Sequence, residues 1–317
     1  MANQNIGTPR FYISYGDYWK SIGSAVPKWQ TINLYSTVEI TVNGSYSFMS
    51  EAATLPSPSA VNGINWFAVL NHNVSPAFYF RCKHFATDTQ QDIGLGGWDT
   101  LINITDATPY PIHSGFSLGT WNTPWTNSET ETLEVGLQGA GSGTFNVGCW
   151  VYGAYYDMPH SPELSLTMSH EYDGVKKQET AGGSTLSYVN YHKPPDWGDL
   201  QAWQLDGWDR KYSGRRVWDL VFNYLSDSDL EPYHYNIDSI SGHANWNEDG
   251  NWFTNVLYHT NGGQLPFIFC PDPNVDFASA TNTIPEFAIC RFDMNTFKRE
   301  QVANGVYNIK IKIKETW

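Results

Sequence analysis

Positively charged residues are scarce in this chain. Charged residues make up 16% of its 317 residues, and 18 Lys and Arg stand against 32 Asp and Glu, which gives a formal net charge of −14. Binding to nucleic-acid phosphates or to an anionic membrane surface needs a face rich in Lys and Arg. We therefore expect no nucleic-acid partner and no membrane insertion.

Long apolar segments are also missing. No stretch approaches the ~18 apolar residues of a membrane-spanning helix. The opening "MANQNIGTPRFY" has neither the basic start nor the apolar centre of a secretory leader. The sequence predicts a protein that is made in a cytoplasm and is not anchored to a membrane.

Cysteine is rare and scattered. Cys82, Cys149, Cys270 and Cys290 form no C-x-x-C pair, and each stands among apolar or aromatic residues. Isolated cysteines in apolar surroundings are typical of buried thiols. We expect free buried thiols in preference to disulfides or metal ligands.

Signatures of catalysis and of metal binding are absent. The sequence has no G-K-[ST] phosphate loop and no G-x-S-x-G motif, and His170 lacks the second histidine of a zinc peptidase. Segment 245–250 is spaced like a calcium loop, but Val256 occupies the position of its bidentate Glu, so a helix N-terminus fits better. The prediction is a non-enzymatic protein with no catalytic residues, metal or cofactor. Paired carboxylates among the 32 acidic residues stay open as an alternative.

The dominant pattern is alternation of apolar and polar residues over short segments. In "NLYSTVEITVNGSYSFMS", Leu34, Val38, Ile40 and Val42 fall on or near one face, and "NGS" offers a turn. Similar segments recur along the chain, separated by Gly, Pro, Asn and Asp. The fold class predicted is mainly β, with two β-sandwich domains, the first of them like a jelly roll.

The length favours two domains over one. We expect an N-terminal arm at 1–30 that packs on the second domain or on a neighbour, a jelly-roll-like sandwich at 31–157, and a β domain at 158–317. Alternation is poor over 105–130, which predicts long loops. A single helix is expected near 248–261, where apolar residues recur at helical spacing between Asn-rich and Gly-rich ends.

The chain closes on a strand, "VYNIKIKIKETW", with two unlike faces. One face is apolar and the other basic, formed by Ile309, Ile311 and Ile313 and by Lys310, Lys312 and Lys314 respectively. The lysines fit either an edge strand guarded by charge or an interface with carboxylates of a neighbouring subunit. Trp317 would then finish the strand against another surface.

Several tryptophans stand in loop-like contexts flanked by Gly, Pro or Asp. Trp98, Trp121 and Trp125 are candidates for contact with a glycan or a protein partner, because exposed aromatic rings suit both. The alternative is that they fold back and cover long loops.

Several longer stretches of the sequence resemble a known class of proteins. "SGRRVWDLVFNYLSDSDL", "NVLYHTNGGQLPFIFCPDPN" and "EFAICRFDMNTFKREQVANGVYNIKIKIKETW" resemble the carboxyl-terminal half of tail structural proteins of marine tailed bacteriophages. "YGAYYDMPHSPELSLTMSHEYDGVKKQETAGGSTLS" is similar to the stretch that joins a sandwich to the tail domain in such proteins. "NGINWFAVLNHNV" resembles the start of galactose-binding-like or discoidin-like sandwiches. The likeness covers about residues 60 to 317 and is strongest after 150.

The resemblance implies a distal tail or baseplate component of a virion. Such a subunit forms a ring with copies of itself, a hexamer or trimer, contacts other tail or baseplate proteins, and carries a peripheral sandwich that could meet a host-surface glycan. The alternatives are a carbohydrate-binding attachment module, a capsid decoration protein and, less favoured, a glycan depolymerase.

Overall fold

The structure is a computed structural model. It describes residues 6–26, 28–32, 38–42, 46–48, 53–54, 64–72, 74, 78–86, 99–103, 116–125, 131–139, 142–164, 166–172, 175–189, 196–197, 200–201, 215–232, 251–273 and 287–316. All strand pairings among these residues are antiparallel. The prediction of a mainly β protein with antiparallel sheets is confirmed.

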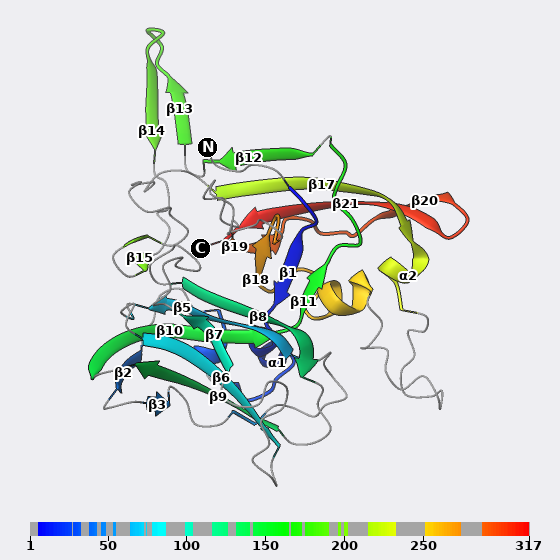
Figure 1. The fold of residues 1–317 in the computed structure, drawn as a ribbon. Helices are drawn as coiled ribbons and strands as arrows, with labels where there is room; N and C mark the ends of the chain where they lie inside the picture. The colour runs from blue at the N-terminus through cyan, green and yellow to red at the C-terminus, as the bar shows by residue number, and fades with distance from the viewer. Residues whose placement is uncertain are drawn as a thin grey trace, which may run out of the picture.

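The largest sheet contains eight strands and gathers both ends of the chain (Figure 1). In spatial order its main path is β11 (Tyr155–Asp157), β1 (Arg10–Ile13), β18 (Phe267–Cys270), β19 (Ala288–Phe292), β21 (Val306–Glu315), β17 (Arg215–Ser226) and β12 (Thr167–Glu171). The eighth strand, β20 (Arg299–Ala303), pairs with β21 off this path. We call this sheet A.

Two further sheets form the stacked layers at the base of the molecule in Figure 1. Sheet B has the order β2 (Val38–Val42), β10 (Gly143–Gly153), β5 (Ile64–His72) and β8 (Phe116–Trp125). Sheet C has the order β3 (Tyr46–Phe48), β9 (Glu131–Gly139), β6 (Phe78–Ala86) and β7 (Asp99–Asn103), and β4 (Ala53–Thr54) also pairs with β9. The edges of the layers adjoin, since β2 contacts β3 and β8 contacts β7.

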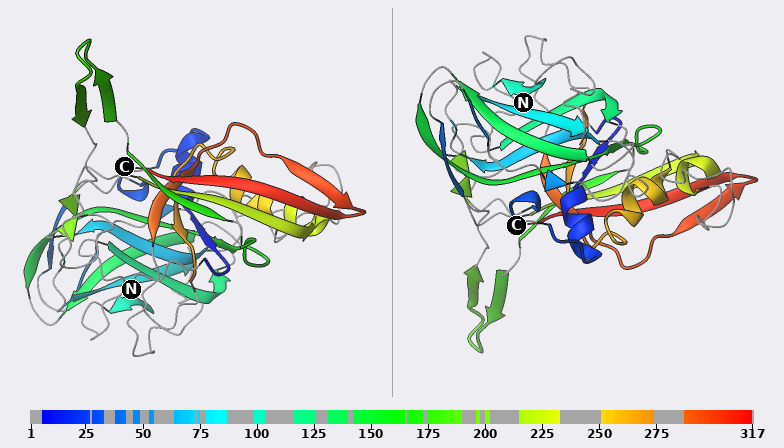
Figure 2. Two further views of the ribbon diagram at one scale, coloured as in Figure 1. Left: turned by 90° about the horizontal axis from the view of Figure 1, so that it is seen from above. Right: turned by 90° about the horizontal axis from the view of Figure 1, so that it is seen from below.

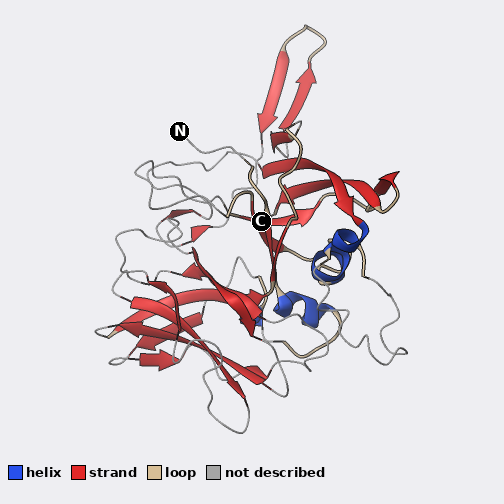
Figure 3. Ribbon diagram, turned by 45° about the vertical axis from the view of Figure 1, so that its right-hand side comes forward, coloured by secondary structure: helices blue, strands red, loops and turns tan. Residues whose placement is uncertain are grey.

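Two small ladders stand apart from these sheets. One is the hairpin of β13 (Val175–Glu179) and β14 (Thr185–Val189), and the other pairs β15 (Asp196–Trp197) with β16 (Leu200–Gln201). Four short helical segments complete the described elements. They are α1 (Tyr15–Ser21), the 3-10 turn η1 (Lys28–Gln30), α2 (Asp227–Leu230) and the π-helix η4 (Phe253–Tyr258), which Figure 3 shows in blue.

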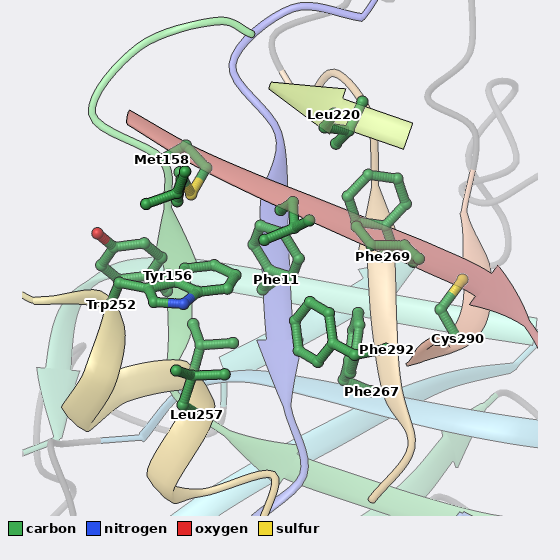
Figure 4. Packing of buried hydrophobic residues seen from close by; sticks show 14 of the residues in the cluster. Phe11, Tyr156, Met158, Leu220, Trp252, Leu257, Phe267, Phe269, Cys290 and Phe292 are labelled. Carbon is green, nitrogen blue, oxygen red and sulfur yellow. The ribbon is translucent and has the colours of Figure 1, made fainter. Parts of the chain in front are cut away.

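Sheet A is buried on both faces around its centre. On one face, Phe11 of β1 packs among aromatic rings, with its ring centroid 5.0 Å from that of Trp252 and 5.6 Å from that of Phe267 (Figure 4). On the other face, Tyr12 meets Trp66 of sheet B, with centroids 5.4 Å apart. Neighbouring residues of one strand therefore enter two different cores, which is why Phe11, Tyr12 and Ile13 of β1 are all apolar or aromatic.

The N-terminal segment is part of the fold. Where the sequence predicts an arm, β1 pairs with β11 on one side and β18 on the other. Helix α1 follows, with the Ser14 hydroxyl accepting from the Asp17 backbone N–H at its start. Tyr15, Tyr18 and Trp19 are buried at helical spacing.

The predicted helix near 248–261 is confirmed in position and is shorter than expected. Asn251 accepts from the Thr254 N–H at 2.8 Å, so an asparagine caps the helix, as the N-terminus interpretation required. The helix ends where Asn261, Gly262 and Gly263 have φ of 51°, 68° and 88°. This run of left-handed residues turns the chain back toward β18.

The prediction of loops over 105–130 is wrong for residues 116–125. These form β8, a ten-residue strand that pairs with β5 despite poor alternation of its own. A strand placed beside a buried partner needs a matching hydrogen-bond ladder more than it needs period-two hydrophobicity, so tertiary pairing overrode the local pattern.

Candidate functional site

The feature that stands out from the body of the molecule is the β13–β14 hairpin, residues 175–189, which we call the arm. It projects away from the sheets in every view (Figures 1 and 2). All side chains from Lys176 to Ser187 are exposed. At the tip, the Thr180 N–H donates to Ser184 O and the Gly183 N–H donates to Thr180 O, both at 2.9 Å, and Gly183 supplies the φ of 79° that the turn needs.

The described side chains of the arm, Lys176 to Ser187, bury almost nothing within their own chain. A two-stranded hairpin on its own is only marginally stable in water, because its side chains find no third layer or strand. Leu186, whose side chain is 58% exposed, is the clearest example of an apolar group left in solvent. The arm therefore has the geometry of an element that gains burial from another surface.

The terminal strand β21 has the two faces that its sequence predicts. Ile309, Ile311 and Ile313 are buried in the core on the helix side of sheet A. The edge-guard interpretation of the lysines is wrong, because β21 lies inside the sheet and pairs with β17 on one side and with β19 and β20 on the other. Charge on this strand does not protect a free edge.

Two of the three lysines are paired within the chain. Lys312 Nζ lies 2.7 Å from Asp293 Oδ2 and 3.6 Å from Glu171 Oε1, and Lys314 pairs with the same glutamate. The hydrogen bond to Asp293 raises the pKa of Lys312. Lys310 is exposed and forms no ion pair among the described residues. Of the three lysines among the interface candidates, Lys310 is thus the one with no ion pair within the described part of the chain.

The structure does not describe the side chains of the four tryptophan candidates. Trp98 and Trp317 lie outside the described residues. Trp121 and Trp125 belong to β8, so their backbone is strand and not the loop that was predicted, and their side chains lie outside the described part. Their roles as glycan or partner contacts stay predictions.

A groove that the sequence did not indicate lies between α1, η4 and the chain that follows β19. Its volume is about 440 Å³. The described lining is mostly aromatic and aliphatic, includes amide and hydroxyl groups, and has no charged side chain: Tyr18, Ile22, Phe253, Leu257, Tyr258, Asn261, Gly262, Met294, Asn295, Thr296 and Phe297. Tyr258, 40% exposed, shares a side-chain hydrogen bond with buried Tyr18, and burial together with that bond raises the pKa of Tyr18.

The described cysteines are inert in their surroundings. Cys149, Cys270 and Cys290 are free and buried, which confirms the prediction for these three. Burial raises the pKa of Cys270 and of Cys290, so neither thiol favours the reactive thiolate. The side chain of Cys82 lies outside the described part.

The described ranges contain neither a cluster of metal ligands nor a membrane-spanning helix. There, no three His, Cys, Asp or Glu side chains come together in a way that could hold a metal ion. No helix of that part of the chain has the length and apolarity to cross a membrane.

Comparison with known proteins gives the chain no relative. It matches no family model, no curated protein and no solved structure.

Proposed function

We propose that this chain is a non-catalytic structural subunit that assembles with copies of itself, and that its place is the tail or baseplate of a virion. The observation that carries the assembly role is the arm, a hairpin whose described side chains, Lys176 to Ser187, are all exposed. The sequence resemblance to phage tail proteins supports the second part of the proposal. Other tail proteins and a host surface are the further partners that it implies.

The body of the subunit suits this role. Sheet A and sheet B share the core that contains Tyr12, Trp66 and Ile268, so the described body of the subunit is one continuous apolar framework. A rigid base favours assembly, because less conformational entropy is lost when the arm meets its partner.

The test is the mass of the protein in solution. In an arm-deletion variant, residues 176–188 are replaced by Gly-Ser, which joins the two arm strands at their base. We expect sedimentation to give an oligomer for the unmodified chain and a folded monomer for the deletion, with circular dichroism that still shows a mainly β protein and cooperative unfolding. An unmodified chain that stays monomeric at high concentration would contradict the proposal.

A second candidate function, binding of a neutral saccharide, is favoured by the groove. Its aromatic rings offer stacking faces, and Asn261, Asn295 and Thr296 offer hydrogen-bond groups without charge. We expect Tyr258→Ala to abolish binding to a host-surface polysaccharide on a glycan array. Tyr224→Ala is the matched control, because Tyr224 is exposed and lies outside the groove. Equal binding by both variants would remove this candidate.

A further inference from the structure

The open edge of sheet A lies at the base of the arm. Strand β12 ends the path of the sheet, and among the described residues it pairs only with β17. Only three residues separate the end of β12 at Glu171 from the start of the arm at Val175. Figure 1 shows β12 at the same end of the molecule as the arm, with the arm pointing away from it. One corner therefore presents both an unfilled edge and a projecting hairpin.

Strand β12 lacks the usual protection of an edge. Its register with β17 runs without a shift from Thr167 to Glu171, and it contains no proline. Thr167, Met168 and Ser169 are exposed and uncharged, and Glu171 is already paired with Lys312 and Lys314. Such an edge offers a straight row of backbone groups to another strand.

The other edges of sheet A are less open. Strand β20 carries Arg299 and Glu300, and its register with β21 shifts between Gln301 and Ala303. A bulge and charges on an edge discourage pairing. Strand β11 has three residues and lies against η4. Among these edges, β12 is the one suited to accept a strand.

We propose that the β12 edge of one subunit accepts the arm of a second copy, so that sheet A continues across the subunit boundary. This inference rests on the proposed assembly function and names its acceptor. The lengths match, since β12, β13 and β14 each have five residues. The arm, with Lys176, Lys177 and Glu179, has a net charge of +1, which is opposite in sign to the net charge of −14 of the whole chain and favours the encounter of two copies.

Each subunit in this arrangement gives one arm and accepts another. Such a contact joins two different surfaces, so it generates a ring when the rotation closes. In this contact the arm buries side chains that are exposed in its own chain, and the backbone N–H and C=O groups on the outer edge of β12 gain hydrogen-bond partners. One contact therefore buries the arm and pairs the edge of β12.

Cross-linking between two differently labelled copies tests the pairing. Full-length Ser169→Cys protein is mixed with Gln178→Cys or with Ser187→Cys protein, which place a thiol on β12, β13 and β14 respectively. A short bismaleimide is added, because its spacer tolerates a register error of one or two residues. We expect a cross-linked peptide that joins position 169 to one arm position, identified by mass spectrometry, and none with unmodified chain.

The control acceptor is Gln301→Cys on β20, which is exposed on an edge strand of the same sheet. Cross-linking to position 301 as strong as to 169 would overturn the inference. So would the absence of any link from 169 while the arm deletion still dissociates the oligomer, a result that leaves the assembly function intact. If the unmodified chain is a monomer, both the proposed assembly function and the pairing of the arm with β12 are overturned.

Discussion

Arg216 at the start of β17 and Glu315 at the end of β21 are joined by three hydrogen bonds, one of them from the Arg216 backbone N–H to Glu315 Oε2 at 3.0 Å. Arg216 Nη2 donates to Glu315 Oε1 at 2.8 Å and Nε donates to Oε2 at 3.1 Å. The same guanidinium donates to Phe287 O at 3.0 Å, beside β19. Glu315 is 3% exposed, so the pair fixes three strands around a carboxylate that is nearly out of solvent.

Removal of this carboxylate should be costly. We expect Glu315→Ala to lower the free energy of unfolding by about 3 kcal/mol, because it leaves a largely buried guanidinium without its partner. Glu300→Ala on exposed β20 is the control and should change it by less than about 0.5 kcal/mol. Denaturant unfolding measures both, and equal values for the two variants would contradict the role of the pair.

The N-terminal strand should be as important to stability as any part of the core. Phe11→Ala removes a ring that contacts Trp252, Phe267 and Phe269, and we expect a loss of about 3–5 kcal/mol. Ile22→Ala, at a side chain that is 59% exposed, should have little effect. If residues 10–13 were not needed for the fold, both variants would have small effects in thermal unfolding; a strand inside the sheet gives one large effect and one small.

His72 should make the protein sensitive to acid. Burial lowers its pKa from 6.5 to about 3, and its Nδ1 accepts from the Val74 N–H. The unfolded chain therefore binds a proton near pH 6.5 that the folded chain does not bind until about pH 3. Within that window the free energy of unfolding should fall as the pH is lowered, by up to about 1.4 kcal/mol per pH unit from this residue.

The matched variant for this prediction is His72→Asn, whose amide oxygen can still accept from Val74 and does not titrate. We expect the difference in unfolding free energy between the two proteins to shrink steadily from pH 7 to pH 4. A difference that is constant over this range would show that His72 is not the source of the acid sensitivity.

The three lysines of β21 should separate into two kinds. Lys312→Glu loses the pairs with Asp293 and Glu171, so it should lower stability, by at most about 1 kcal/mol because the pairs are partly exposed. Lys310→Glu should leave stability unchanged and weaken self-association, because this side chain is exposed and forms no ion pair among the described residues. Sedimentation at several protein concentrations, alongside denaturant unfolding, distinguishes the two effects; unchanged association in Lys310→Glu would exclude Lys310 from the interface.

Local sequence patterns predicted the structure correctly where the conformation and burial of a residue depend mainly on its neighbours in the sequence. The alternation at the C-terminus predicted the buried face of Ile309, Ile311 and Ile313, and the Asn-rich segment predicted the start of η4. The sequence of the arm did not predict its position. Alternation of apolar and polar residues indicates a strand with one face packed on a core, and the described side chains of this hairpin pack on no core. Helix α1 could have been found from the Ser14 to Asp17 capping pattern ahead of its buried aromatic residues.

The sequence by itself determined that the chain is mainly β, which face of its last strand is buried, and that its described cysteines are free thiols. Those properties follow from the period of the strand and from side-chain transfer out of water, and both act over a few residues. Only the tertiary structure decided that β21 lies inside sheet A, that β1 joins β11 to β18, and that β12 pairs with β17 alone among the described residues. Strand neighbours are chosen by contacts between residues far apart in the chain, so no local pattern contains them.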